Sequence, residues 1–312
     1  MAASKKDAIK KYNHRKKIKF MDKPIKSYKA FDENMRCRGF QYEVGKEYDM
    51  NGDIKCCKRG FHACESPIEV WDYYDMLTSR FAEVEQSGKI STEADSTKVC
   101  SSHIKIKAEL KLADIINIGV EWLKDLTSPS KIKDDSATLN DGGFDKKQIG
   151  SSGDSAQIGS SGDSAQIGSS GYYAKIGSSG GYAKIGSSGG YAKIGSSGDS
   201  AQIGSSGYYA QIGSSGGYAK IGSSGGYAKI GSSGDYAKID STGEDSVIMC
   251  AGPRSVAKAK IGSWITLADW DWDDRKGRLV PVCVKTERVD GIKIKPDTWY
   301  KLQDGEFVEV TE

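Results

Sequence analysis

Cysteine and histidine residues gather in the first third of the chain, in a pattern that raises the question of a metal site. Cys56 and Cys57 are followed by His62 and Cys64, and Cys37 lies upstream. Thiolates and imidazoles are the ligands that zinc prefers, but the two-residue spacing of common zinc-binding cysteine pairs is absent. Adjacent cysteines of a strand also point to opposite sides. The sequence therefore favours small buried thiols, and neither a metal nor a cofactor is expected.

Aspartate recurs at one place in a nine-residue repeat, which raises the question of calcium. Asp154, Asp163, Asp199 and Asp235 each follow the second glycine of a repeat unit. Nonapeptide rolls that bind calcium need an aspartate in nearly every turn, whereas most turns here carry glycine or tyrosine. The repeat is therefore not expected to bind calcium.

A resemblance to ADP-ribosyltransferases covers two short segments. Residues 60–74, GFHACESPIEVWDYY, resemble the strand-then-helix segment with which these enzymes hold NAD, and residues 28–31, YKAF, would be the first NAD-binding strand. The early histidine of that family is absent, and only Glu83 and Glu85 are candidates for its catalytic glutamate. The three histidines have no serine, cysteine or aspartate partner at a diagnostic spacing. The resemblance therefore implies a degenerate, non-enzymatic domain, with the active transferase as an alternative.

The nine-residue repeat is the largest structural element that the sequence predicts. Isoleucine recurs every nine residues from Ile149 to Ile248, in units that read Ala-(Lys/Gln)-Ile-Gly-Ser-Ser-Gly-x-x. Because side chains alternate along a strand, the Lys or Gln faces water, while Ala, Ile and the first Ser face inward. The glycine at the turn is expected to take a positive φ. An isoleucine held in register predicts an ordered solenoid, since a disordered linker has no reason to keep it.

The variable pair of each unit sets the size of the coil. These pairs run DS, YY, GY, GY and then repeat, a period of four units, which is divisible by two but not by three. We therefore predict a two-sided parallel β-solenoid with 18 residues per coil. Tyrosines 18 residues apart then form an unbroken ladder on one face, and on the other face tyrosines alternate with Ser164 and Ser200.

The ladders and their neighbouring lysines are the candidate binding surface. Tyrosine rings beside lysine could contact a protein or stack on nucleotide bases, although ring ladders also stabilise any solenoid. The candidate ligand- or partner-binding residues are Tyr173, Tyr191, Tyr209, Tyr227, Lys175, Lys193, Lys229, Tyr182, Tyr218 and Tyr236.

The segment before the repeat has ordinary complexity. Alternating apolar and polar residues predict strands at 26–31, 40–48, 80–88 and 101–110. Ser66, Pro67 and Glu69 form the signature of a capping box, which predicts a helix as far as Leu77. A second helix is expected over residues 112–124, and Ser87-Gly88 is expected to be a turn.

The chain is thus predicted to be mainly β, with an N-terminal α+β domain, the solenoid and a C-terminal β-meander cap. In the cap, Asp290-Gly291 and Asp304-Gly305 predict hairpin turns, and the four tryptophans between residues 264 and 299 are expected to be core or cap residues and not a ligand site. The predicted boundaries are a basic arm at 1–25, the head at 26–125, a linker at 126–135, the solenoid at 136–268 and the cap at 269–312.

Charge and composition limit the kinds of partner and the cellular compartment that the sequence suggests. Residues 1–20 carry eight basic side chains and one aspartate, a net charge of +7, while the whole chain is at +3. Such an arm suits an anionic partner, although a solvated tail is the favoured interpretation. No apolar run resembles a signal peptide or is long enough to span a bilayer. Seven cysteines, an odd number, without an export signal are typical of reduced thiols in a cytoplasm.

Three motifs taken together carry a second resemblance. YKAFDENMRCRGFQYEVGKEY, CKRGFHACESPIEVWDYY and VDGIKIKPDTWYKLQDGEF, around a short repeat rich in Gly, Ser and Ala, resemble a family of uncharacterised proteins encoded by tailed bacteriophages and prophages. The resemblance implies a protein made in the bacterial host. It supplies no catalytic residues.

The favoured hypothesis is a non-enzymatic, phage-encoded interaction or scaffold protein that presents the Tyr/Lys ladders to a host or virion partner. One alternative is a host-defence antagonist that sequesters a nucleotide signal, and another is the transferase-like head. The expected location is the host bacterial cytoplasm or the virion. A host or phage protein is the expected partner, with a nucleotide or nucleic acid as an alternative. Open coil ends also allow self-association into homo-oligomers.

Overall fold

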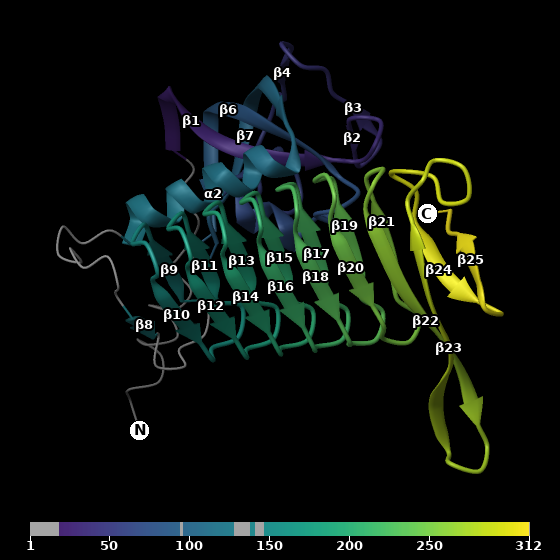
Figure 1. Ribbon diagram of the computed structural model, residues 1–312. Coiled ribbons are helices and arrows are strands. Elements are labelled where there is room, and N and C mark those ends of the chain that lie inside the picture. Colours follow the sequence, from purple (N-terminus) through teal and green to yellow (C-terminus); the bar gives the residue numbers. More distant parts are fainter. Residues whose placement is uncertain (1–18, 94–95, 128–137, 141–146, 312) are drawn as a thin grey trace, which may run out of the picture. The chain divides into compact units, whose positions relative to one another are not determined.

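The structure is a computed structural model, and it describes residues 19–93, 96–127, 138–140 and 147–311 (Figure 1). The chain divides into two compact units, Met1–Leu110 and Lys111–Glu312, each of which is described by itself. The basic arm as far as residue 18 and most of the expected linker lie outside the described residues. The rest of the arm belongs to the first strand, which begins at Lys19.

The first unit is built on an antiparallel sheet that closes on itself. Its strand order is β4-β7-β5-β1-β6, and β6 also pairs with β7. Phe31, Ala82, Val84, Ile104 and Ile106 are fully buried in its core. The strands are β1 (Lys19–Phe31), β4 (Glu47–Asp49), β5 (Phe61–Cys64), β6 (Arg80–Thr92) and β7 (Lys98–Leu110), with a separate pair of β2 (Arg36–Cys37) and β3 (Phe40–Gln41).

The helix predicted from Ser66 is much shorter than expected, and its capping box does not form. Only a 3-10 helix, η1 (Ile68–Asp72), is present, and Pro67 is its N-cap without a side-chain hydrogen bond. The Glu69 carboxylate instead accepts hydrogen bonds from the Thr97 backbone N–H and from the Thr97 hydroxyl, at 3.1 and 2.6 Å. A tertiary contact therefore outweighs the local capping signal. The Ser87-Gly88 turn is also wrong, because both residues lie inside β6, where the register shifts.

The second unit is the solenoid, and it consists of two sheets whose strands alternate along the chain (Figure 1). The sheet that we call the open sheet contains β8 (Thr138–Asn140), β10 (Gln157–Ser160), β12 (Lys175–Ser178), β14 (Lys193–Ser196), β16 (Gln211–Ser214), β18 (Lys229–Ser232), β20 (Val247–Cys250), β22 (Trp264–Asp273) and β23 (Arg278–Arg288). The covered sheet contains β9 (Gln148–Ser151), β11 (Gln166–Ser169), β13 (Lys184–Ser187), β15 (Gln202–Ser205), β17 (Lys220–Ser223), β19 (Lys238–Ser241), β21 (Val256–Ala259), β24 (Tyr300–Gln303) and β25 (Glu306–Glu309).

The register confirms the two-sided coil of 18 residues. Ile176 pairs with Ile194 in the open sheet, and Ile185 pairs with Ile203 in the covered sheet. The isoleucines, the alanines and, apart from Ser151, the first serine of each unit are buried, as the alternation predicts. The core is therefore a narrow stack of identical rungs.

The turn residues take conformations that the sequence does not reveal. Positive φ occurs at the residue before each alanine, as at Tyr191 (φ 57°) and Ser200 (φ 57°), and not at the expected turn glycine. That glycine is needed for a different reason. A Cβ on Gly198 would lie 2.0 Å from the Gly180 carbonyl oxygen of the preceding coil. The glycine therefore permits the close approach of successive coils.

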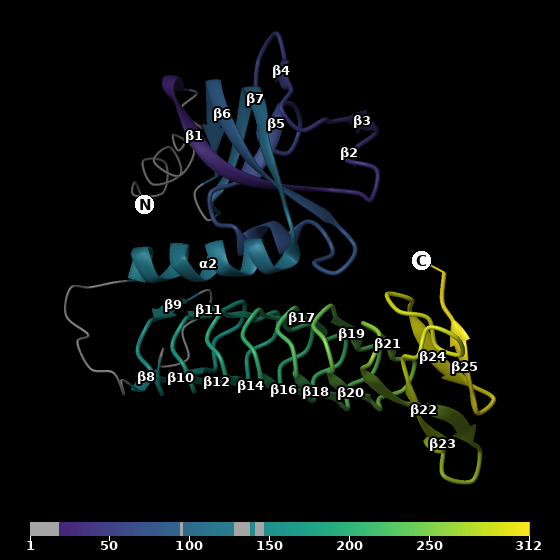
Figure 2. The same ribbon diagram turned by 45° about the horizontal axis from the view of Figure 1, so that its top comes forward.

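One helix, α2 (Leu112–Thr127), lies along the covered sheet over β9, β11, β13 and β15 (Figure 2). The sequence predicts this helix but assigns it to the head, whereas the two compact units divide between Leu110 and Lys111. The reason is its apolar face, since Val120 and Leu123 are buried and lie on Gly186 and Gly168.

The C-terminal cap consists of two hairpins, one extending each sheet. β22 and β23 are antiparallel on the open sheet, and β24 and β25 are antiparallel on the covered sheet. Asp304-Gly305 forms the expected hairpin turn. Asp290-Gly291 does not, because the Asp290 carboxylate accepts the N–H groups of Ile292, Lys293 and Ile294 in a local turn.

The tryptophans of the cap are only partly in the core. Trp299 is 7% exposed, and the Trp270 indole donates to the Ala251 carbonyl at 2.9 Å. Trp264 and Trp272 are 46% and 57% exposed on β22, so these two of the expected core or cap residues lie outside the core.

Candidate partner-binding face of the solenoid

The predicted tyrosine ladder is present as a continuous stack of rings. The Tyr173–Tyr191, Tyr191–Tyr209 and Tyr209–Tyr227 ring centroids are 5.1, 4.9 and 5.0 Å apart, with interplanar angles of 20° or less. Each ring precedes a strand of the open sheet by two residues. The left-handed backbone conformation projects these side chains from the corner, and they are 42–55% exposed.

The second ladder, along the covered sheet, is interrupted. Tyr218 and Tyr236 stack with centroids 4.9 Å apart and planes 2° apart. Ser200 occupies the rung between Tyr182 and Tyr218, which leaves Tyr182 separate, as the repeat pattern predicts. The first ladder therefore offers the longer aromatic surface.

The predicted lysines flank a shallow groove on the open sheet. Lys175, Lys193 and Lys229 are exposed and stand in one row with Gln157 and Gln211. Beside this row runs a stripe of glycines, and a Cβ on any of them would meet nothing within 4 Å: Gly159, Gly177, Gly195, Gly213 and Gly231. Among the described residues that line the groove, none is acidic.

The groove ends on apolar side chains at the cap. In β20, Val247 follows the Lys/Gln row and Met249 follows the glycine stripe, and they are 49% and 55% exposed. Trp264 pairs with Val247 in the next strand and is also exposed. The face therefore combines a flat floor, a cationic edge and an apolar end.

The covered sheet has the same stripe, and there the stripe carries α2. The Leu123 side chain lies 3.0 Å from where a Gly168 Cβ would be, and the Val120 side chain lies 3.3 Å from where a Gly186 Cβ would be. Lys184, in the row beside this stripe, is only 2% exposed. The helix bears Asp114, Glu121 and Asp125 against one lysine. The glycine stripe of the covered sheet is thus the surface on which an acidic amphipathic helix packs.

The aspartates of the repeat have a structural role in the turns. The Asp163 carboxylate accepts the Gly181 backbone N–H of the next coil at 2.8 Å, and Asp199 accepts that of Gly217 at the same distance. These carboxylates link successive coils, which accounts for their scattered occurrence.

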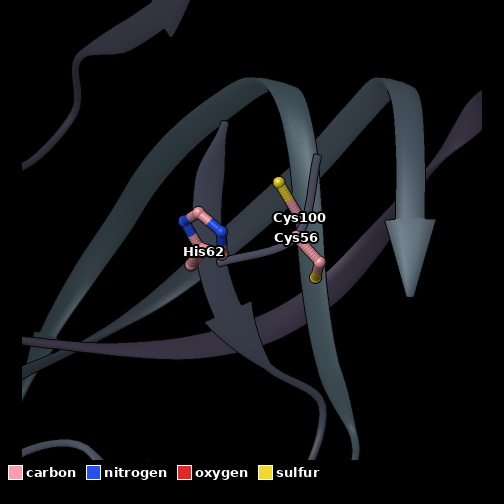
Figure 3. Close-up of side chains that lie close together, drawn as sticks. All are labelled: Cys56, His62 and Cys100. Carbon is pink, nitrogen blue, oxygen red and sulfur yellow. The ribbon is translucent and has the colours of Figure 1, made fainter. Parts of the chain in front are cut away.

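Three potential metal ligands lie close together in the first unit. Cys56, His62 and Cys100 come from the loop before β5, from β5 and from β7, and their ligand atoms lie within 4.8 Å of one another (Figure 3). The imidazole Nε2 accepts the Cys57 backbone N–H at 2.9 Å, and the Cys100 thiol donates to the Arg59 carbonyl at 3.2 Å. Burial raises the pKa of Cys100 to about 12. The groups are satisfied as neutral thiols and a neutral ring, and zinc would have to displace these hydrogen bonds.

The two candidates for a transferase glutamate stand in surface ion pairs. Glu83 pairs with Lys26 at 2.9 Å, and Glu85 pairs with Lys107 at 3.1 Å. The motif segments do converge, because Tyr28 of β1 pairs with Cys64 of β5. Neither glutamate lines the cavity between these segments.

Comparison with known proteins identifies one region of the chain. A family model described as a domain of unknown function (DUF7666) matches residues 25–118. No curated protein and no solved structure matches the chain. Within the described residues, no helix is both long and apolar enough to cross a membrane.

The glycine stripe is the part of this face that sequence reasoning missed. The strand pattern places each of these glycines on the outer side, next to the lysine row, so their location was available from the alternation. What the pattern cannot reveal is that a helix occupies one of the two stripes, because the repeat letters of the two sheets are nearly the same.

Proposed function

We propose that the chain is a non-enzymatic interaction or scaffold protein whose open sheet binds an acidic amphipathic helix of a partner protein. The observation that carries this proposal is α2, which occupies the equivalent glycine stripe of the covered sheet. The open sheet has the same backbone and nearly the same side chains, and no helix of the described residues lies over its glycine stripe.

The dimensions of the open stripe suit a helix of that kind. Its five glycines span four strand spacings of about 4.8 Å, or about 19 Å in all. A helix rises 1.5 Å per residue, so about 13 residues would cover the stripe. The α2 helix, with 16 residues, covers four strands in this way. Branched side chains at positions i, i+4 and i+7, as at Ile116, Val120 and Leu123, would fill the glycine floor.

The ladder and the lysine row give this contact its selectivity. Lys175, Lys193 and Lys229 favour acidic side chains on one flank of the helix, since opposite charges steer association. The stacked rings of the first ladder stand two residues before the Lys or Gln of this row in each coil, and aromatic side chains are frequent anchors of protein interfaces. Val247 and Met249 would receive an apolar end of the partner.

A role during phage infection is part of the proposal and rests on the resemblance of the three motifs to phage-encoded proteins. The partner would then be a host or phage protein, met in the bacterial cytoplasm or in the virion. The sequence of α2 describes the chemistry of that partner, but it does not identify it.

A peptide with the sequence of residues 111–127 is a direct probe of the open stripe. Fluorescence anisotropy should show saturable binding of the labelled peptide to the full-length protein, and the combined substitution Gly195→Val and Gly213→Val should weaken it at least tenfold. Tyr218→Ser, on the other ladder, is the matched control and should leave the affinity unchanged. Absence of binding, or equal binding to the groove-filled variant, would refute the proposal.

Charge is tested separately with a second peptide. Replacing Asp114 and Asp125 by lysine in the probe should weaken its binding, and the difference between the peptides should shrink at 1 M salt, where the Debye length is about 3 Å. An unchanged affinity would remove the acidic character from the proposed partner.

A further inference from the structure

A second candidate site lies within the first unit, far in sequence from the solenoid. A cavity of about 410 Å³ is lined by residues of β1, of the segment 37–42, of the segment 57–64 and of the region after η1. Pockets for small molecules have volumes of about 300–1,000 Å³, so this cavity suits a small ligand.

The charge of this cavity is one-sided. Five cationic side chains line it, and among the described lining residues none is acidic. Arg38, Lys58 and Arg59 are exposed at its rim, while Lys29 is 4% exposed. Like charges gathered in a concave site concentrate the field there, and this field favours an anion.

Lys29 is the least ordinary of these cations. Its ammonium donates to the His62 carbonyl at 3.0 Å and to the Cys37 thiol at 3.3 Å, and it stands over the Phe31 and Tyr42 rings at 5.3 and 5.5 Å. Desolvation by burial lowers its pKa. A buried ammonium is costly unless a negative charge offsets it, and these partners are a carbonyl, a thiol and ring faces. An anionic group of a ligand would offset it.

Aromatic rings form the walls. Phe40 is 46% exposed and packs edge-on against Tyr42, with ring centroids 4.8 Å apart. Tyr73 is 44% exposed and has the Lys98 ammonium 4.0 Å from its centroid. Exposed aromatic faces next to cations are the surfaces on which planar rings of bound nucleotides stack.

We propose that this cavity binds a small phosphorylated molecule that carries a planar ring, with Lys29 and the rim cations at the phosphate and with Phe40 or Tyr73 against the ring. The site is independent of the solenoid and of the partner proposed for it.

The probes for this site are the four ribonucleoside 5′-monophosphates, with the matching nucleosides and inorganic phosphate as controls. Isothermal titration of the full-length protein should show at least one monophosphate binding more than tenfold tighter than its nucleoside and than phosphate.

Two variants and one control locate the site. Lys29→Met should weaken binding at least tenfold. Arg38→Asn, at an exposed residue with φ 51° where asparagine is well tolerated, should weaken it without affecting the fold. Lys107→Met removes a cation outside the cavity and should leave affinity unchanged. No binding of any monophosphate at millimolar concentration, or equal binding by Arg38→Asn, overturns the proposal and leaves that for the solenoid unaffected.

Discussion

Substituting either of two glycines three residues apart tests how the solenoid is held together. A Cβ on Gly198 would lie 2.0 Å from the Gly180 carbonyl oxygen and 2.4 Å from its carbon, and real contacts of this kind essentially never fall below 3.0 Å. The neighbour is backbone, so the two coils must separate by about 1 Å. The Ser197–Ser178 and Tyr182–Asp199 backbone hydrogen bonds between these coils, now 3.0 and 2.8 Å long, would then exceed hydrogen-bonding distance.

The loss of these hydrogen bonds determines how far the free energy of unfolding should fall. A buried polar group left without a partner costs about 1–3 kcal/mol, so Gly198→Ala should destabilise the protein by about 3 kcal/mol or more. For a unit of this size the Tm should fall by about 6–12 °C. Gly195→Ala is the matched control, because its Cβ would meet nothing within 4 Å. It should leave the stability equal or raise it by up to about 1 kcal/mol, since alanine restricts the unfolded chain.

Circular dichroism melts and urea unfolding of the full-length protein check this difference. Equal stability of Gly198→Ala and Gly195→Ala would refute the reasoning that invariant turn glycines serve coil-to-coil contact. A loss in both variants would show instead that glycine is required throughout the repeat for its flexibility.

Three further predictions concern side chains. The double substitution Tyr191→Ser and Tyr209→Ser should reduce Tm only slightly, because serine already occupies equivalent left-handed positions of the repeat. It should weaken binding of the helical peptide, because the stacked rings are lost. A large fall in Tm with unchanged peptide binding would show that the ladder serves stability alone. Desolvation by burial is the main reason that the pKa of His62 is lowered from the ordinary 6.5 to about 4. Between these two pH values the unfolded chain binds more protons than the folded chain. The stability that is present above pH 6.5 should therefore be lost as the pH falls toward 4. His62→Gln should flatten that slope in urea unfolding at pH 7, 5 and 4, and an unchanged slope would exclude His62 as its source. Glu69→Gln should lower the free energy of unfolding of the first unit by about 2 kcal/mol, because the Glu69 carboxylate is only 6% exposed and accepts charge-assisted hydrogen bonds. Asp72→Asn, at an exposed residue nearby, is the control and should lower the free energy of unfolding by less than about 1 kcal/mol.

The solenoid could be predicted from the sequence because every coil has the same neighbours above and below it. A nine-residue period, the parity of the lysines and the four-unit order of the variable pairs are enough to determine the coil and the stacking of Tyr191 on Tyr209. The positive φ of these tyrosines was not predictable, because glycine is the usual residue for that conformation and it stands elsewhere in the unit. The steric reason for that glycine lies in the neighbouring coil.

The first unit was less predictable, because its decisive contacts join distant segments. Glu69 has the spacing of a capping box, yet its carboxylate binds Thr97, which is 28 residues away. The cavity likewise unites β1, the segment 57–64 and Lys98, and no local pattern signals that their cations converge. The strands expected at 26–31, 80–88 and 101–110 follow from alternation and form parts of β1, β6 and β7. The strand expected at 40–48 is wrong, because only its ends are strands, in β3 and β4.

The difference between the two sheets arises outside the repeat. Lys184 of the covered sheet and Lys193 of the open sheet occupy equivalent places in identical units, but only Lys184 is buried, because α2 lies over it. Among the described residues the chain has one α-helix, and it lies over the stripe of the covered sheet, so the equivalent stripe of the open sheet has no described helix over it. The chemistry that α2 uses on the covered sheet is therefore the best available description of what would bind the open sheet.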